Sequence, residues 1–398
     1  KKNKNKLIEL IGSETGKPYW ECEQEINAAI NKSNATITAY NYRCNYPIVS
    51  SEVKETSTII KPIGTVAVIG PYNFPIHIPH GQIIPALLTG NTVLVKPSEY
   101  CIQTTKFYEK LWAECFFDIE SPISFIYGNH EVGKKIVQDP LIDFIFFTGS
   151  FNTGYQIESI CQQLRKPVAL EMGGNNALII EDIHPKIINH IIMSSFISAG
   201  QRCSCARRII INKKHANIIE KIIKRTKALK LNTFPNEQLP FMGPVVLEDV
   251  KNKILNQSFL NSTTLLKSDY LGKGNLITPR IELSSNTYKE EIFGPIIFIY
   301  LSNSFEESLH IANQGDYGLT ASIYTKSKKN YNYAIQTIKT GVINWNNPTT
   351  GASSMAPFGG VKNSGNHRPG GFNMIDHCIV PISSTQSKRV IEINCPGL

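Results

Sequence analysis

Short apolar runs alternate with longer helical segments from residue 65 onward. Five apolar runs predict buried strands at residues 65–69, 92–95, 123–127, 142–147 and 167–170. Four intervening segments predict helices at residues 80–88, 104–115, 131–138 and 153–164. Such strands are typical of a parallel sheet covered by helices on both faces. Ligands of these sheets bind beyond the carboxyl ends of the strands, where the chain carries Asn73, Lys96, Glu99, Ser150 and Glu171.

A second alternation of strands and helices follows residue 176. Its strands are predicted at residues 177–180, 208–211, 296–301, 321–324 and 342–344. Its helices are predicted at residues 214–229, 248–259, 305–313 and 330–340. The polar residues 261–275 predict an irregular surface segment. Two alternations in a chain of 398 residues predict an α/β protein of two or three domains.

The two ends of the chain follow other patterns. Residues 7–30 predict helix, with breaks at Gly12 and at Gly16-Lys17-Pro18. Residues 42–60 predict a β-ribbon that ends in a β-branched run, and residues 379–382 predict an edge strand. The chain opens on Lys1, inside a predicted helix, so we expect an incomplete N-terminus.

Composition narrows the classes of partner. The net charge is +9, but the lysines are scattered and form no basic-aromatic stripe, so we expect no nucleic-acid partner. No apolar run approaches the ~18 residues of a membrane span, and no signal peptide opens the chain. The nine cysteines include no CxxC pair and no Cys/His set with zinc-ligand spacing. We therefore expect reduced thiols, a cytoplasmic protein, no membrane partner and no metal.

One stretch concentrates the candidate chemistry. Cys203 follows Gly200-Gln201-Arg202, and Glu171 lies upstream in a glycine-rich turn. A strand-to-helix turn that begins at Gly149 and Ser150 precedes both. A lone cysteine is usually a packing residue, as we expect of Cys205. A thiol, a carboxylate and a nucleotide-type turn together favour covalent oxidation of an aldehyde.

Seven motifs, in this order, resemble those of the aldehyde dehydrogenase superfamily. They are Pro71-Tyr72-Asn73-Phe74-Pro75, Lys96-Pro97-Ser98-Glu99, Phe147-Thr148-Gly149-Ser150, Glu171-Met172-Gly173-Gly174, Gly200-Gln201-Arg202-Cys203, Glu291-Ile292-Phe293-Gly294-Pro295 and Pro357-Phe358-Gly359-Gly360. The resemblance implies a Rossmann-like NAD-binding domain (residues 1–47 and 62–172) and an α/β catalytic domain (173–376). It also implies a small β oligomerisation arm (48–61 and 377–398) that pairs subunits into a homodimer or homotetramer.

The resemblance implies roles for individual residues. Cys203 is expected to attack the aldehyde, Asn73 and the Cys203 backbone N–H to stabilise the oxyanion, and Glu171 to activate water. Lys96 and Glu99 are expected to hold the adenosine ribose, and Glu99 to favour NAD over NADP. The remaining expected NAD-binding residues are Gly149, Ser150, Phe151, Asn152, Thr153 and Gly154 at the pyrophosphate, with Glu291 and Phe293 at the nicotinamide ribose and ring.

Three regions are more specific than the superfamily motifs. Residues 169–176, 200–208 and the pair 350–354 with 365–369 resemble the branch that oxidises N-succinylglutamate 5-semialdehyde in the succinyltransferase pathway of arginine degradation. That substrate carries two carboxylates and an amide, so its site is expected to present cations and hydroxyls. The candidates are Arg207, Ser353, Ser354, His367 and Arg368, although the arginines are equally suited to bracing loops or a subunit interface.

Three alternatives stay open at this point. The first is another aldehyde substrate, such as glutamate 5-semialdehyde or a simple aliphatic aldehyde. The second is a catalytically silent nucleotide-binding protein, which the joint presence of Cys203, Glu171 and Asn73 disfavours. The third is acyl transfer to coenzyme A, which Glu171 disfavours because it can activate water instead. The chain also departs from the family pattern at residues 116–122, where a Gly-Pro-Gly loop is usual.

Overall fold

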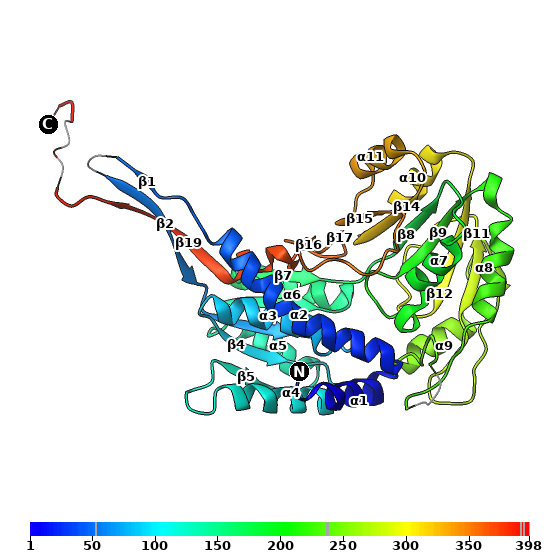
Figure 1. Ribbon diagram of the computed structural model, residues 1–398, viewed down its shortest axis with the longest axis horizontal. Coiled ribbons are helices and arrows are strands. Elements are labelled where there is room, and N and C mark those ends of the chain that lie inside the picture. Colours follow the sequence, from blue (N-terminus) through cyan, green and yellow to red (C-terminus); the bar gives the residue numbers. More distant parts are fainter. Residues whose placement is uncertain (52–53, 236–238, 391, 393–394, 398) are drawn as a thin grey trace.

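Two large sheets and a projecting ribbon organise the chain in the computed structural model (Figure 1). The structure describes residues 1–51, 54–235, 239–390, 392 and 395–397. The first sheet has the order β5-β4-β3-β6-β7, and all its strands are parallel. Its strands are β3 Thr65–Ile69, β4 Thr92–Lys96, β5 Ile123–Phe125, β6 Phe144–Thr148 and β7 Val168–Glu171. The helices between them are α3 His77–Leu88, α4 Ile102–Cys115, α5 His130–Gln138 and α6 Phe151–Leu164.

The first sheet is buried on both faces, as its apolar strands predict. Val66 and Val68 of β3 pack in one core cluster, whereas Ala67 of the same strand packs in another. All five predicted strands and all four predicted helices of this region are confirmed, with ends shifted by a few residues. Because parallel strands end at one edge, Asn73, Lys96 and Glu171 come to the same side of the sheet.

The second sheet has seven strands in the order β10-β11-β12-β9-β8-β14-β15. They are β8 Asn176–Ile180, β9 Ala206–Asn212, β10 Ser262–Leu266, β11 Arg280–Ser284, β12 Ile296–Ser302, β14 Thr320–Tyr324 and β15 Val342–Trp345. The α-helices of this part are α7 Ile187–Phe196, α8 Ile218–Lys227, α9 Glu248–Asn256, α10 Phe305–Asn313 and α11 Lys328–Thr337. Shorter elements are η1 Ile197–Gly200, η2 Lys213–His215, β13 Tyr317–Gly318, β16 Pro357–Phe358, β17 Val361–Lys362, β18 Gly370–Gly371 and η3 Phe372–Cys378.

Three elements of this region, β10, β11 and α7, differ from the sequence prediction. Residues 261–275 were expected to be irregular, but β10 lies there and pairs antiparallel with β11. It is an edge strand with only one neighbour in the sheet order, so its polar side chains stay partly in solvent and its sequence lacks an apolar run. The sequence pattern also missed α7 and β11.

The N-terminal helices are α1 Lys4–Thr15 and α2 Tyr19–Arg43. The predicted break at Gly12 is wrong, because Gly12 lies inside α1. A Cβ there would come within 2.4 Å of the Phe234 ring, so this glycine serves close packing. The predicted break at residues 16–18 is confirmed, since Gly16 ends α1 in the left-handed conformation. Helix α2 continues to Arg43, beyond its predicted end at residue 30.

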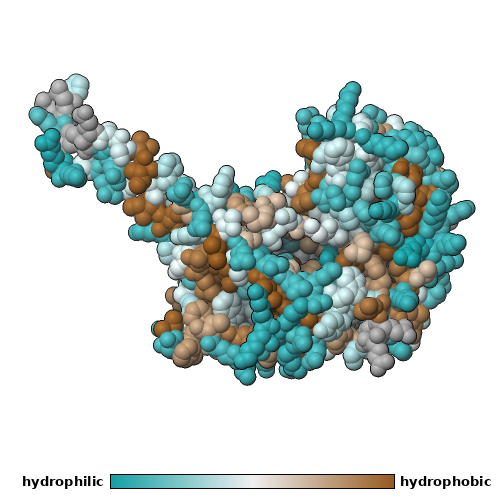
Figure 2. Space-filling view, in the orientation of Figure 1, coloured by the Kyte–Doolittle hydropathy of each residue, from teal (hydrophilic) through white to brown (hydrophobic). Residues whose placement is uncertain are grey.

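The ribbon joins two segments that are far apart in the sequence. Strand β2 Glu55–Pro62 pairs with β1 Val49–Ser50 and, over its whole length, with β19 Ile379–Gln386. It projects from the body (Figure 1) and carries exposed apolar residues, which Figure 2 shows in brown. Except for Pro62 at the end of β2, the ribbon lies within the arm segments expected at residues 48–61 and 377–398. Residues 52–53, 391, 393–394 and 398 of these segments lie outside the described part. None of the described helices is long and apolar enough to cross a membrane.

Candidate active site

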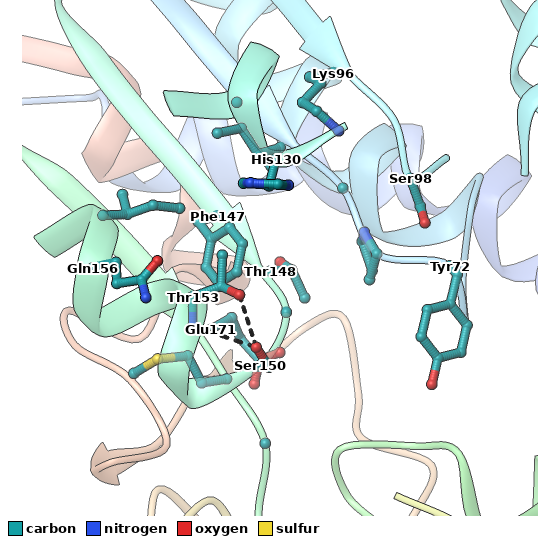
Figure 3. Close-up of a pocket in the computed structure, with 18 of the residues that line it drawn as sticks. Tyr72, Lys96, Ser98, His130, Phe147, Thr148, Ser150, Thr153, Gln156 and Glu171 are labelled. Carbon is teal, nitrogen blue, oxygen red and sulfur yellow. Dashed lines mark hydrogen bonds between the residues drawn. The ribbon is translucent and has the colours of Figure 1, made fainter. Parts of the chain in front are cut away.

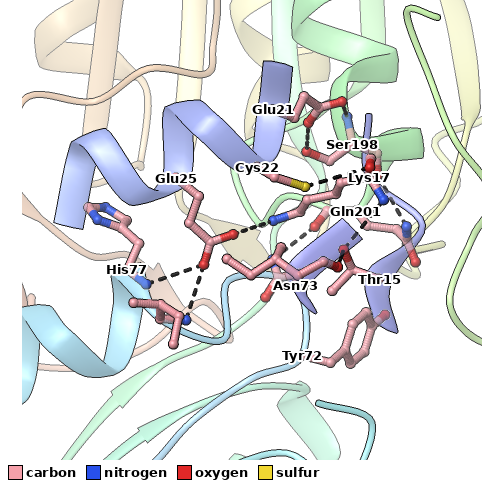
Figure 4. Close-up of polar contacts among 12 residues, drawn as sticks. Thr15, Lys17, Glu21, Cys22, Glu25, Tyr72, Asn73, His77, Ser198 and Gln201 are labelled. Atoms are coloured by element: carbon pink, nitrogen blue, oxygen red, sulfur yellow. Dashed lines mark hydrogen bonds and ion pairs between the residues drawn. The ribbon is translucent and has the colours of Figure 1, made fainter. Parts of the chain in front are cut away.

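A left-handed turn places Cys203. Ser198, Ala199 and Gly200 have φ angles of 53°, 53° and 70° between α7 and β9. Glycine is required at position 200, because a Cβ there would lie 2.2 Å from the Gly294 carbonyl oxygen. The turn is held from α2, where the buried Glu21 carboxylate accepts hydrogen bonds from the Ser198 backbone N–H at 3.1 Å and from its hydroxyl (Figure 4).

Gln201 fixes the next part of the loop. Its side-chain oxygen accepts a hydrogen bond from the Val246 N–H at 2.9 Å. Its carbonyl oxygen accepts one from the Asn73 amide at 2.8 Å (Figure 4). A carboxamide nitrogen has two N–H groups, so Asn73 keeps a second donor. The structure therefore brings the buried Asn73 side chain, which follows β3, against the loop that carries Cys203.

Glu171 and Cys203 form one electrostatic unit. Burial and the nearby Glu291 charge raise the pKa of Glu171 to about 8, against a hydrogen bond from the Cys203 thiol that lowers it. Burial and the charges of Glu171 and Glu291 raise the pKa of the Cys203 thiol well above its usual value. Glu171 Oε1 is buried and has no hydrogen-bond partner among the described residues. A carboxylate of this kind, beside a thiol, has the basicity to exchange a proton near neutral pH.

Two cavities meet at this unit. The larger has a volume of about 900 Å³, the smaller about 330 Å³, and Ile78, Thr148, Glu171 and Cys203 line both. Asn73 lines the larger one. Cys205 is not among the described residues that line either cavity. It is fully buried, and its thiol faces the Ile197 carbonyl at 3.7 Å.

The larger cavity gathers most of the residues expected at a dinucleotide. Its wall includes Lys96, Glu99, Gly149, Ser150, Thr153, Glu291 and Phe293. Lys96 ends β4, and Ser98 follows it (Figure 3). Thr148 ends β6, Ser150 caps α6, and Thr153 lies in the first turn of α6 (Figure 3). Lys96 is buried, its amine lies 3.7 Å from a Glu99 oxygen, and burial lowers its pKa. The N-terminus of α6, capped by Ser150, also opens on this cavity.

Three residues of the expected pyrophosphate turn lie outside the described cavity wall. Asn152 is exposed, and the Phe151 ring packs against the rings of Tyr155 and Tyr317. Gly154 is buried, and a Cβ there would lie 2.3 Å from the Met172 sulfur. The structure thus gives Gly154 a close-packing position within α6.

Glu291 is held at the inner end of the larger cavity. Its carboxylate accepts a hydrogen bond from the Gly174 N–H at 3.0 Å and lies 3.9 Å from Arg207. Burial raises its pKa to about 7, while Arg207 and the Gly174 N–H act in the opposite direction. Gly173 makes room for it, because a Cβ at that position would lie 1.7 Å from the carboxylate.

The smaller cavity includes only some of the expected substrate residues. Ser353 and Ser354 line it. Arg207 lies outside its described wall and donates to the Gly200 and Arg202 carbonyls at 2.5 and 3.3 Å, so it braces the loop. His367 and Arg368 are exposed and lie outside the described walls of both cavities.

Sequence reasoning missed a set of residues in the smaller cavity. Helices α2 and α3 and the turn before α3 contribute Gln24, Glu25, Ala28, Lys32, Phe74, His77, Gly81 and Gln82. One signal was present, since Lys32 is the only charged residue between Glu25 and Arg43. The pattern of α2 alone did not indicate that this lysine faces a cavity.

Comparison with known proteins agrees with this arrangement. The profile of the Aldehyde dehydrogenase family matches residues 1–381. The chain is 39% identical to the N-succinylglutamate 5-semialdehyde dehydrogenase of Legionella pneumophila (strain Corby), over 97% of this chain and 80% of the relative. It is 38% identical to the protein of that name from Serratia proteamaculans (strain 568), over 98% and 82% of the two chains.

Solved structures share the fold. A 1-pyrroline-5-carboxylate dehydrogenase from Thermus with bound NAD has 27% identity and a TM-score of 0.89, covering 97% of this chain and 78% of its own. Betaine aldehyde dehydrogenase from Staphylococcus aureus in complex with NAD⁺, as a Y450L mutant, has 25% identity and a TM-score of 0.91, covering 99% and 82%. By sequence profile, identity and fold, the chain belongs to the aldehyde dehydrogenase family.

Proposed function

We propose that this protein oxidises N-succinylglutamate 5-semialdehyde to N-succinylglutamate with NAD as the acceptor. The observation that carries the proposal is the meeting of two cavities at Cys203 and Glu171. One cavity has the size and polar groups for a dinucleotide, and the other has space for a smaller molecule. The curated relatives that bear the name of this activity supply the choice of substrate.

Cys203 is the nucleophile of the proposed mechanism. Its sulfur attacks the aldehyde carbon, and the thiol proton passes to the Glu171 carboxylate, which lines the same two cavities. The carbonyl oxygen then carries a negative charge. The second N–H of the Asn73 amide and the Cys203 backbone N–H stabilise this charge as fixed donors.

The residues of the larger cavity fit a nicotinamide dinucleotide. Among the described residues, the buried Lys96 amine has two partners, the adjacent Pro97 carbonyl and the Glu99 carboxylate. It can therefore donate to a ribose hydroxyl, while Glu99 accepts from one. The α6 N-terminus would hold the pyrophosphate, and Glu291 would accept a hydrogen bond from the second ribose. When bound, NAD would supply the hydride acceptor, and loss of the hydride from the former aldehyde carbon would leave a thioester on Cys203.

Glu171 completes the cycle as the general base. The thiol proton that it accepted first leaves for solvent. The free carboxylate then takes a proton from water, and the resulting hydroxide attacks the thioester carbon. The carbon–sulfur bond then breaks, the acid is released, and the Cys203 thiolate takes the proton from Glu171. The buried position of Glu171 beside Cys203 supports this role over transfer of the acyl group to coenzyme A.

NAD is preferred over NADP in this proposal because of Glu99. A carboxylate accepts a hydrogen bond from the free 2′-hydroxyl of NAD and repels the 2′-phosphate of NADP. We also propose that the ribbon pairs copies of the chain into a homodimer or homotetramer. Its exposed Val49, Ile59 and Val380 side chains support an interface there. The nine free cysteines suit a cytoplasmic protein.

A substrate panel with NADH absorbance tests the proposal. We expect the highest kcat/KM for N-succinylglutamate 5-semialdehyde, with lower values for glutamate 5-semialdehyde and butanal. Cys203→Ala should lower turnover by about 10³-fold or more, while Cys205→Ala should keep most of it. A higher kcat/KM for either competing aldehyde would contradict the substrate, and full activity of Cys203→Ala would contradict the mechanism.

A further inference from the structure

The smaller cavity holds a cation that no acidic group neutralises. Lys32 lines it from α2 and has no hydrogen-bond or ion-pair partner among the described residues. The other cations nearby are paired. Arg202 lies 3.1 Å from Glu21, and Lys17 lies 2.8 Å from Glu25. An ammonium group that faces a cavity without a counterion has its full capacity to bind an anion there.

The fold keeps Lys32 in this position. Helix α2 packs along α3, and the lysine side chain crosses α3 at Gly81. A Cβ at Gly81 would lie 2.8 Å from the Lys32 Cε carbon, so a larger residue would displace the amine. Burial without a counterion lowers the pKa of Lys32 to about 8. At neutral pH most of the amine therefore still carries its charge.

The groups that face Lys32 do not cancel this charge. Glu25 lines the same cavity, but its carboxylate is bonded to Lys17 and to the backbone N–H groups of Ile76 and His77 (Figure 4). Glu171 has a pKa of about 8 and is mostly protonated at neutral pH. His77 is neutral, because burial and the Lys32 charge lower its pKa to about 3. The cavity is thus positive at the wall that Lys32 forms.

We propose that Lys32 binds a carboxylate of the substrate and thereby selects acylated, dianionic semialdehydes. For the identity of the substrate this inference rests on the proposed function. The succinylated semialdehyde has two carboxylates and no cation, whereas free glutamate 5-semialdehyde carries an ammonium group that Lys32 repels. The Ser353 and Ser354 residues line the same cavity and can add hydroxyl donors. The α-carboxylate and the succinyl carboxylate offer the same chemistry to Lys32.

Matched variants and three aldehydes test this role. Lys32→Met removes the charge and keeps the length, Lys32→Arg keeps the charge, and Lys110→Met removes an exposed charge on α4. For N-succinylglutamate 5-semialdehyde, Lys32→Met should lower kcat/KM by about 10- to 100-fold, chiefly through KM. Butanal, which has no carboxylate, should be oxidised at the wild-type rate. Lys32→Arg should recover part of the loss, and Lys110→Met should behave as wild type.

A third aldehyde identifies which carboxylate is bound. N-acetylglutamate 5-semialdehyde retains only the α-carboxylate. If Lys32→Met lowers kcat/KM for this aldehyde as much as for the succinylated substrate, Lys32 binds the α-carboxylate. If kcat/KM for this aldehyde is unchanged, Lys32 binds the succinyl carboxylate. The proposal is overturned if Lys32→Met leaves kcat/KM for the succinylated substrate unchanged. It is equally overturned if Lys32→Met lowers kcat/KM for butanal as much, because the lysine would then act on folding or on the chemistry.

Equilibrium binding separates this proposal from the proposed function. Titration calorimetry without NAD should show that Lys32→Met binds N-succinylglutamate about 10- to 100-fold more weakly than wild type. If wild type binds this dicarboxylate more tightly than the variant but does not oxidise the semialdehyde, the function fails and the carboxylate site stands. If the two proteins bind it equally while wild type turns the semialdehyde over, the carboxylate site fails and the function stands.

Discussion

The Glu21 carboxylate, near the start of the chain, holds Ser198 by both its backbone N–H and its hydroxyl. The same carboxylate lies 3.1 Å from the Arg202 guanidinium, which also donates to the Ser198 hydroxyl. Ser198 has a positive φ and begins the turn that leads to Cys203. A fully buried carboxylate needs such partners to remain charged. Helix α2 therefore supports the nucleophile loop as well as lining the smaller cavity.

Glu21→Gln should destabilise the protein and disturb the nucleophile. Removing the charge leaves the Arg202 guanidinium without its counterion, at a cost of about 3 kcal/mol. We expect a lower urea midpoint and slower alkylation of Cys203 by iodoacetamide. Glu23→Gln is the matched control, since Glu23 is partly exposed and pairs with Lys4 at 2.7 Å. Its cost should stay below about 1 kcal/mol, and equal costs for the two variants would contradict a special role of Glu21.

The parts of the fold that the sequence predicted share one physical property. Strands β3, β6 and β7 are buried on both faces, so nearly every position must be apolar and the run is visible in the sequence. Once the sheet is known to be parallel, Asn73, Lys96 and Glu171 must lie at one edge. The edge strand β10 escaped prediction because its exposed positions accept polar residues.

The substrate side of the site was harder to predict. Of the expected residues, Ser353 and Ser354 line the smaller cavity. Arg207 instead bonds to the loop that carries Cys203, and His367 lies on the surface. A residue type indicates what a side chain can bind, whereas its direction depends on how distant elements pack. Lys32 illustrates this limit, because only the packing of α2 on α3 turns it toward the cavity.

Turnover should follow the ionisation of Glu171. The base acts as a carboxylate, so kcat should rise with pH through about 8 and then level off. Glu171→Gln should lower kcat by about 10²-fold or more and remove this rise, because no base remains to activate water. Steady-state NADH formation between pH 6 and pH 9.5 measures both effects. Glu291→Gln is the control; it should raise KM for NAD and keep the rise in kcat, but at lower pH, because the Glu291 charge contributes to the raised pKa of Glu171.

Stability should depend on the same carboxyl group. The folded protein holds the Glu171 proton up to about pH 8, whereas an unfolded glutamate loses it near its ordinary pKa of 4.5. The contribution of protonated Glu171 is therefore complete below pH 4.5 and is lost as the pH rises through 8. Glutamine does not ionise, so the melting temperature of Glu171→Gln minus that of wild type should increase as the pH rises from 5 to 9. A constant difference in melting temperature across that range would show that burial does not shift this pKa.

Glu99 should control the choice between NAD and NADP. Glu99→Gln removes the charge that repels a 2′-phosphate and keeps the size of the side chain. Because the side chain is half exposed and beside Lys96, we expect a change of about 10-fold in the ratio of kcat/KM values in favour of NADP. Glu114→Gln, at an exposed position of α4, controls for net charge and should leave the ratio unchanged. An unchanged ratio in Glu99→Gln would place the ribose elsewhere.

Arg208→Lys should destabilise the protein although it preserves the charge. The buried guanidinium donates to four carbonyl oxygens, those of Asn175, Ile311, Ala312 and Gln314. Burial without a carboxylate partner lowers its pKa to about 10. A lysine has one nitrogen and cannot reach all four acceptors, so about 3 kcal/mol of stability should be lost. Urea unfolding measures the loss, and Arg225→Lys, at an exposed position of α8, should cost almost nothing.

Arg208→Lys should also weaken binding of NAD in the larger cavity. The Asn175 carbonyl held by Arg208 follows Gly174, whose N–H donates to Glu291 at 3.0 Å. Without the arginine, the segment that precedes β8 is no longer tied to the C-terminus of α10. Glu291 therefore loses its fixed position. We expect Arg208→Lys to raise KM for NAD more than KM for the aldehyde. Equal changes in the two KM values would mean that Arg208 supports the fold as a whole, without a particular link to Glu291.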